Sequence, residues 1–107
     1  MPPESISVGD VFVIKTPSLK KKRPHIVLSF LPDEAYLLFG IFTYKLHHDL
    51  EICYHFEPSP SLPRYFTNAS IVDFREDWSY QASVLYQLIE QDRCWYKGYF
   101  PTHIVIN

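Results

Sequence analysis

Short runs rich in β-branched and aromatic residues alternate along this chain with segments marked by proline. Nine prolines accompany only three glycines, so proline marks the turns that the sequence predicts. Proline lacks a backbone donor and is confined to the ends and edges of strands, whereas β-branched and aromatic side chains suit a pleated, half-buried surface. The pattern therefore predicts a mainly β fold and not a helical bundle.

Five segments have the composition of strands. The first three are Val11–Lys15, His25–Phe30 and Ala35–Tyr44, and their connections are short enough for antiparallel neighbours. Residues 49–56 alternate polar with apolar side chains, as a half-buried strand does, and Ala69–Phe74 is the fifth candidate. The first half of the chain therefore predicts a meander that begins a curled sheet or barrel.

Ser79–Gln91 is the segment with a helical pattern. Ser79 is suited to cap its first turn, and apolar residues recur at the spacing of one helical face, at Ala82, Leu85, Tyr86 and Ile89. Cys94–Phe100 reads as a last strand, although Pro101 is equally suited to open a short helix over Thr102–Ile106.

Two segments are predicted to be loops. Thr16–Pro24 carries three lysines and an arginine, and a proline near each end makes continuation of either flanking strand unexpected. Glu57–Pro63 is rich in proline and serine, as exposed surface loops are. The chain shows no internal repeat, and its 107 residues, with 47% hydrophobic residues, suit one domain over residues 1–107 with one core.

The formal charge of −2 gives the whole molecule no attraction for phosphate, so a nucleic-acid contact requires a local concentration of cations. Lys20–Arg23 supplies one. No apolar stretch approaches the length of a membrane span, and the first residues lack the pattern of a secretory signal, so a cytoplasmic location is expected. In such a compartment Cys53 and Cys94 are expected to be thiols and not a disulfide.

The opening of the chain combines a Gly-Asp-aliphatic strand at Val8–Phe12, a basic loop, and an Arg-Pro strand over Arg23–Ser29. In this it resembles the MazF/PemK group of toxin-type RNA-cutting proteins. Ser70–Phe74 is similar to a strand that precedes the helix in one branch of that group. The resemblance implies an SH3-like small β-barrel with one helix after the fifth strand.

The same resemblance implies a function. It is that of an endoribonuclease of a toxin-antitoxin system, which cuts single-stranded RNA without metal, works as a homodimer and is inhibited by a cognate antitoxin. Arg23, stiffened by Pro24, is implied to neutralise the scissile phosphate, and Thr43 falls where the group carries a Thr or Ser beside its catalytic Arg. The alternative is a non-catalytic SH3-like module that binds protein or nucleic acid.

Other residues are candidates for holding the RNA. Lys20, Lys21 and Lys22 are expected to attract its phosphates, and Arg64 with Tyr65, beside the proline-rich loop, is expected to stack on it. His25 follows the Arg-Pro pair, and its pattern allows either a buried side chain or a base.

Possible metal ligands recur at odd positions from His47 to His55. Alternate residues of one strand are about 7 Å apart, so a straight strand cannot surround an ion. We therefore expect neither a metal nor another cofactor. Cys53 has no activating base at a fixed spacing, which argues against a cysteine nucleophile.

Overall fold

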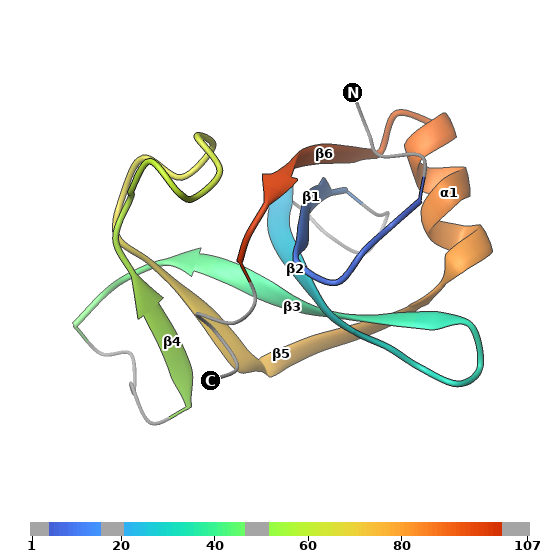
Figure 1. Cartoon of the computed structure of the whole chain (residues 1–107), viewed down its shortest axis with the longest axis horizontal. Coiled ribbons are helices and arrows are strands. Elements are labelled where there is room, and N and C mark those ends of the chain that lie inside the picture. The colour runs from blue at the N-terminus through green and yellow to red at the C-terminus, as the bar shows by residue number, and fades with distance from the viewer. Residues whose placement is uncertain (1–4, 16–20, 47–51, 102–107) are drawn as a thin grey trace.

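The computed structural model describes residues 5–15, 21–46 and 52–101, apart from the side chain of residue 76. Within these ranges the chain is mainly β, with one helix after the fifth strand (Figure 1). This confirms the predicted fold class. The elements are β1 (Asp10–Ile14), β2 (Arg23–Phe30), β3 (Ala35–Thr43), β4 (Cys53–Phe56), β5 (Ser70–Gln81), α1 (Ala82–Glu90) and β6 (Cys94–Tyr99).

The six strands form one antiparallel sheet in the order β4-β5-β3-β2-β1-β6. Its centre is the predicted meander of β1, β2 and β3. The two outer strands, β4 and β6, are not paired with each other in the described chain, so hydrogen bonds do not close the sheet into a barrel. The sheet nevertheless curls strongly (Figure 1).

Aromatic side chains join the two edges of the curled sheet. Phe56 of β4 lies 5.0 Å from Phe100, which follows β6, and 5.1 Å from Phe66 of the loop before β5, between ring centres in both cases. Edge-to-face contacts of this kind add to the stabilisation from burial alone. The three rings belong to a buried core that also contains Val11, Ile26, Ile41 and Val72.

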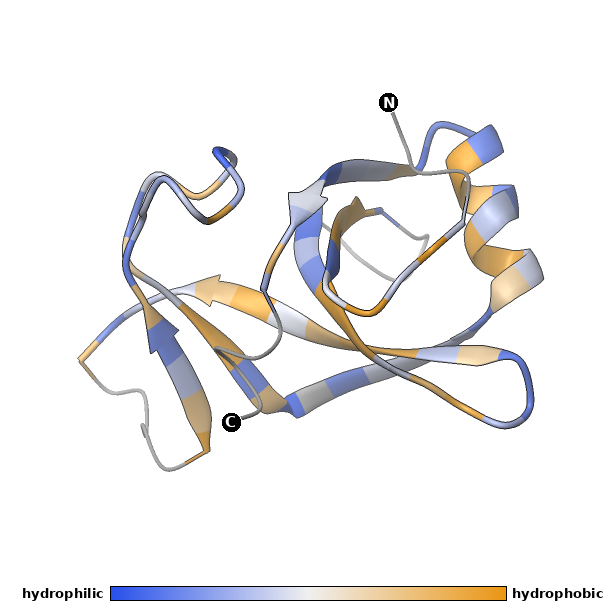
Figure 2. Ribbon diagram, viewed as in Figure 1, coloured by the Kyte–Doolittle hydropathy of each residue, from blue (hydrophilic) through white to orange (hydrophobic). Residues whose placement is uncertain are grey.

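Helix α1 covers the other face of the sheet. Leu85 is fully buried there, and it packs with Phe12, Ile14, Val27, Leu38 and Cys94. Figure 2 shows apolar residues along β1 and much of β3, and polar residues in the middle of β5. The helix has nine residues, and no helix in the described ranges is long and apolar enough to cross a membrane.

The predicted start of the helix is wrong. Ser79 does not cap α1 but lies in β5, opposite Leu37 of β3. Strand β3 offers partners as far as Ala35, so β5 continues to Gln81 before the helix begins. The Ala82 amide then donates to the Glu34 carbonyl at 2.9 Å, which replaces a side-chain cap.

Strand β2 also begins earlier than predicted, because it contains Arg23 and Pro24. Pro24 lies opposite Val13 of β1, whereas the pairing of β2 with β3 starts only at His25. Proline is therefore placed near the start of the strand, where a missing donor is tolerated. The alternation expected for β4 is not kept: Cys53 is buried, and Tyr44 stacks at 4.3 Å on His55. Residues 49–51 and the alternative helix over 102–106 lie outside the described residues.

Candidate functional site

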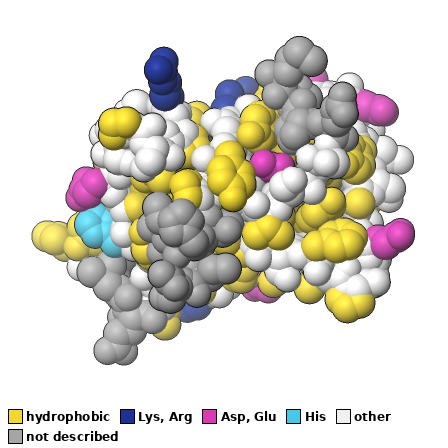
Figure 3. Space-filling model, viewed as in Figure 1, with side chains coloured by type: hydrophobic (Ala, Val, Ile, Leu, Met, Phe, Trp, Pro, Cys, Tyr) yellow, Lys and Arg dark blue, Asp and Glu magenta, His cyan; other side chains and the backbone are white. Residues whose placement is uncertain are grey.

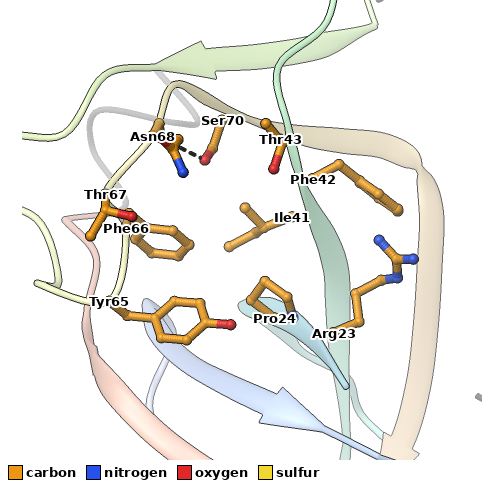
Figure 4. Close-up of a pocket in the computed structure, with 10 residues that line it drawn as sticks. All are labelled: Arg23, Pro24, Ile41, Phe42, Thr43, Tyr65, Phe66, Thr67, Asn68 and Ser70. Atoms are coloured by element: carbon orange, nitrogen blue, oxygen red, sulfur yellow. Dashed lines mark hydrogen bonds between the residues drawn. The ribbon is translucent and has the colours of Figure 1, made fainter. Parts of the chain in front are cut away.

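A pocket of about 270 Å³ opens beside the start of β2, the end of β3 and the loop before β5 (Figure 4). We call it the central pocket. It brings together Arg23, Thr43 and Tyr65, which come from three separate segments and were each singled out in the sequence. The other lining residues are Pro24, Ile41, Phe42, Phe66, Thr67, Asn68 and Ser70.

Arg23 lies at the rim of this pocket. Its guanidinium carbon is 4.3 Å from the centre of the Phe42 ring, and among the described side chains no carboxylate forms an ion pair with it. Phe42 and Thr43 are consecutive strand residues, so their side chains leave opposite faces of the sheet. Figure 4 accordingly shows Arg23 and Phe42 on one side of β3 and Thr43 on the other.

The interior of the central pocket is polar but uncharged. Thr43 lies opposite Ser70 across β3 and β5, and the Ser70 hydroxyl donates to the Asn68 carbonyl at 2.9 Å. Thr67 and the Asn68 amide are exposed at its wall. The described lining thus offers hydroxyls, an amide and one guanidinium, but no carboxylate or imidazole. It suits a neutral polar group with an anion at the rim.

His25 is buried and is not available as a base. Its Nδ1–H donates to the Arg23 carbonyl at 2.9 Å, and its ring meets Trp78 edge-to-face at 4.6 Å. Burial lowers its pKa to about 4, an effect to which the neighbouring Arg23 charge adds and which the bond to the carbonyl partly opposes. Of the two possibilities left open by the sequence, the structure selects the buried, neutral residue.

A shallow hollow adjoins the central pocket at Tyr65. We call it the Tyr65 hollow; its lining is Arg64, Tyr65, Tyr96, Lys97 and Gly98. Tyr65 is 43% exposed, and Lys97 Nζ lies 5.7 Å from the centre of its ring. Lys97 is the extra residue of a bulge, because Val11 pairs with Gly98 and Phe12 with Tyr96. Bulges redirect side chains, and here the redirected side chain is a cation.

A third hollow lies at the other end of β6. This Trp95 hollow is lined by Lys15, Lys22, Gln91, Asp92, Arg93 and Trp95. Lys22 Nζ lies 4.4 Å from the centre of the Trp95 rings. The central pocket and the two hollows therefore contain six of the ten Lys and Arg residues but only one acid, Asp92, so this surface is positive although the chain is not. On the face seen in Figure 3, Lys and Arg side chains are visible at the upper edge and also at the lower edge.

Gly98 supports the Tyr65 hollow. Its φ is +127°, a conformation that favours glycine, and a Cβ there would lie 3.1 Å from Cβ of Pro63. Gly98→Ala is expected to lower the free energy of unfolding by about 2 kcal/mol, because it adds backbone strain and crowds the Pro63 ring. Urea unfolding of the variant and the native chain measures the difference. A midpoint equal to that of the native chain would show that the bulge relaxes freely.

The structure places the predicted RNA-binding residues unequally. Arg64 and Tyr65 line the Tyr65 hollow, and Lys22 lies over Trp95. Lys21 is exposed but lines none of the three sites, and Lys20 lies outside the described residues. Sequence reasoning missed Phe42, Asn68 and Ser70, since nothing in their spacing marks them as neighbours of Arg23.

The cysteines and possible metal ligands form no further site in the described chain. Cys53 and Cys94 are both buried and not joined in a disulfide, and burial raises the pKa of the Cys94 thiol to about 12. Among the residues described, no three His, Cys, Asp or Glu side chains gather as a metal site requires. Most of the polar series from His47 to His55 lies outside those residues.

No known protein family, curated protein or solved structure matches this chain. The resemblance to the MazF/PemK group therefore stays a prediction from the sequence.

Proposed function

We propose that this chain binds single-stranded RNA along the central pocket and the Tyr65 hollow. The observation that carries the proposal is the pairing of cations with aromatic rings: Arg23 lies on Phe42 and Lys97 lies near Tyr65. Single strands are held by cations that follow the phosphates and by aromatic rings that stack with the bases. Both kinds of group are present here, side by side.

The charge distribution favours an RNA strand over a protein as the ligand. Arg23 sits at the rim without an acidic partner among the described side chains, so binding a phosphate would break no ion pair seen there. The polar wall of Thr67, Asn68 and Ser70 offers hydrogen bonds to a base or a ribose. Acidic peptides could use the cations but would leave this neutral wall unused.

Replacing Tyr65 by alanine is expected to weaken RNA binding about tenfold, because loss of one stacked base costs roughly 1–3 kcal/mol. Tyr65→Phe keeps the ring and is expected to bind like the native chain. Fluorescence anisotropy of a labelled oligouridylate, titrated in chelator at low salt, measures both.

Phe30→Ala is the matched control, since Phe30 is 54% exposed and lines none of the three sites. It is expected to bind RNA like the native chain. The absence of binding by the native protein, or native affinity in Tyr65→Ala, would contradict the proposal.

Cleavage of the bound strand is a second candidate, favoured by the presence of Arg23 and Thr43 in one pocket. For both to act on one phosphate, the guanidinium would have to leave Phe42, because the two side chains emerge on opposite faces. Homodimer formation and inhibition by an antitoxin belong to this candidate. The same RNA incubation tests it: defined fragments that disappear in Arg23→Ala support cleavage, whereas intact RNA leaves a binding module.

A further inference from the structure

We infer that the RNA-binding surface continues to Trp95, whose indole is a second stacking platform that Lys22 covers in the free protein. This inference rests on the proposed function, because it names a further site on the path of the same strand. It concerns a different hollow, at the opposite end of β6 from Tyr65.

The pairing register places Trp95 in line with the central pocket. Val13 of β1 lies opposite Pro24 on one side and opposite Trp95 on the other. Directly paired residues project from the same face of a sheet. Pro24, which lines the central pocket, is therefore two strand spacings, about 10 Å, from Trp95 on the same face. A short stretch of extended RNA spans such a distance.

The indole is held by its edge and not by its face. Trp95 Nε1–H donates to Asp92 Oδ1 at 2.6 Å. Asp92 itself is fixed in the turn that ends α1, with φ of 58° and its amide bonded to the Ile89 carbonyl at 3.1 Å. The carboxylate thus orients the ring before any ligand arrives, which lowers the entropy lost on binding.

Lys22 is a replaceable cover for the ring. Its ammonium lies 4.4 Å from the ring centre and forms no ion pair among the described side chains. A cation and a base use the same aromatic face, so a base can stack on Trp95 while Lys22 moves to the adjacent phosphate. Lys15 and Arg93, which line the same hollow, add to the attraction for phosphate.

The second tryptophan has a different environment and gives a spectroscopic control. Trp78 is half-buried, with its ring against His25 and near Gly40. In a Trp78→Phe background the fluorescence comes from Trp95 alone, since the chain has two tryptophans. Saturation with an oligouridylate of about twelve nucleotides is expected to quench this emission. One of only two nucleotides, which is too short to reach Trp95 from the central pocket, is expected to leave it largely unchanged.

Binding measurements on single variants provide a test that does not depend on the Trp78 change. Trp95→Ala is expected to lower affinity for the longer oligouridylate about tenfold and to leave the shorter one unaffected. Trp95→Phe, which keeps a ring, is expected to recover most of the affinity. Asp92→Gly suits the backbone turn but removes the acceptor for the indole N–H, so a loss of affinity smaller than that of Trp95→Ala is expected. Asp92→Asn, which keeps a side-chain oxygen as acceptor, is its matched control.

The outcomes separate this inference from the proposed function. If Tyr65→Ala loses affinity while Trp95→Ala binds the longer oligouridylate like the native chain, the RNA path ends before Trp95 and the inference is overturned. Unchanged Trp95 emission at saturation overturns it as well. Failure of the native chain to bind either oligouridylate removes the proposed function itself.

Discussion

Replacing Gly9 by alanine is expected to lower the free energy of unfolding by about 4 kcal/mol, the sum of backbone strain and overpacking. The φ of Gly9 is +103°, and a Cβ there would lie 2.6 Å from Cε1 of Tyr99 and 2.7 Å from the Phe100 carbonyl oxygen. The turn cannot easily move away. The Gly9 amide donates to the Val27 carbonyl at 2.7 Å, and its carbonyl accepts from the Phe100 amide at 2.8 Å.

Gly40→Ala is the matched control for this prediction. The φ of Gly40 is outside the left-handed region, and the atoms nearest to its added Cβ would be ring atoms, of Phe42 at 2.9 Å and of Trp78 at 3.1 Å. Side-chain rings can shift where a backbone carbonyl cannot, so a loss of about 1 kcal/mol is expected. Urea unfolding of the two variants decides the matter; equal losses would mean that the Gly9 turn has no special constraint.

The Gly-Asp pair that carries much of the family resemblance thus has a structural role. Gly9 allows the backbone to lie close to the Phe100 carbonyl, where a Cβ would clash. The buried Asp10 carboxylate accepts a hydrogen bond from the Ser7 amide at 2.7 Å. Neither residue lines the central pocket or the two hollows. Similarity at this pair therefore indicates a barrel-like scaffold, whereas the proposed RNA binding depends on residues elsewhere.

Local sequence patterns predicted most of the strands and the helix, because most of these elements depend on residues that are close together in the chain. The β-branched runs of β1 to β3 and the apolar spacing around Leu85 are readable without knowledge of their partners. The second half of β5 is not, because the polar residues from Asp73 to Asp77 show no strand alternation. That half is a strand because Leu37, Leu38 and their neighbours in β3 pair with it, and such pairing is a property of the whole sheet.

The site was less predictable than the fold for the same reason. Composition and resemblance singled out Arg23, Thr43 and Tyr65, and the pocket does contain all three. The opposite orientations of Arg23 and Thr43 follow from strand register, and the contact of Lys22 with Trp95 requires β6 to lie beside β1. Chain order alone specifies neither, since it does not contain the pairing of distant strands.

Acidification is expected to destabilise the chain by about 3 kcal/mol in total through His25. The pKa of this group falls from 6.5 to about 4 on folding, because burial disfavours the charged ring. Below pH 6.5 the unfolded chain binds a proton at His25 that the folded chain does not. The free energy of unfolding therefore decreases as the pH is lowered, until the folded His25 titrates near pH 4. Above pH 6.5 the histidine contributes no pH dependence.

His25→Phe isolates this effect. Phenylalanine keeps a flat ring against Trp78 and removes Nε2, a buried nitrogen that has no hydrogen-bond partner in the described chain. Burial raises the pKa of Asp10, so that carboxyl acts in the opposite sense, but it is common to both proteins and cancels in their difference. Urea unfolding at about pH 7.5 and about pH 4.5 is expected to show a smaller loss for the variant, by roughly 2–3 kcal/mol. Equal losses of unfolding free energy in the two proteins would mean that other groups set the acid stability and that the buried imidazole binds its proton as readily in the folded chain as in the unfolded chain.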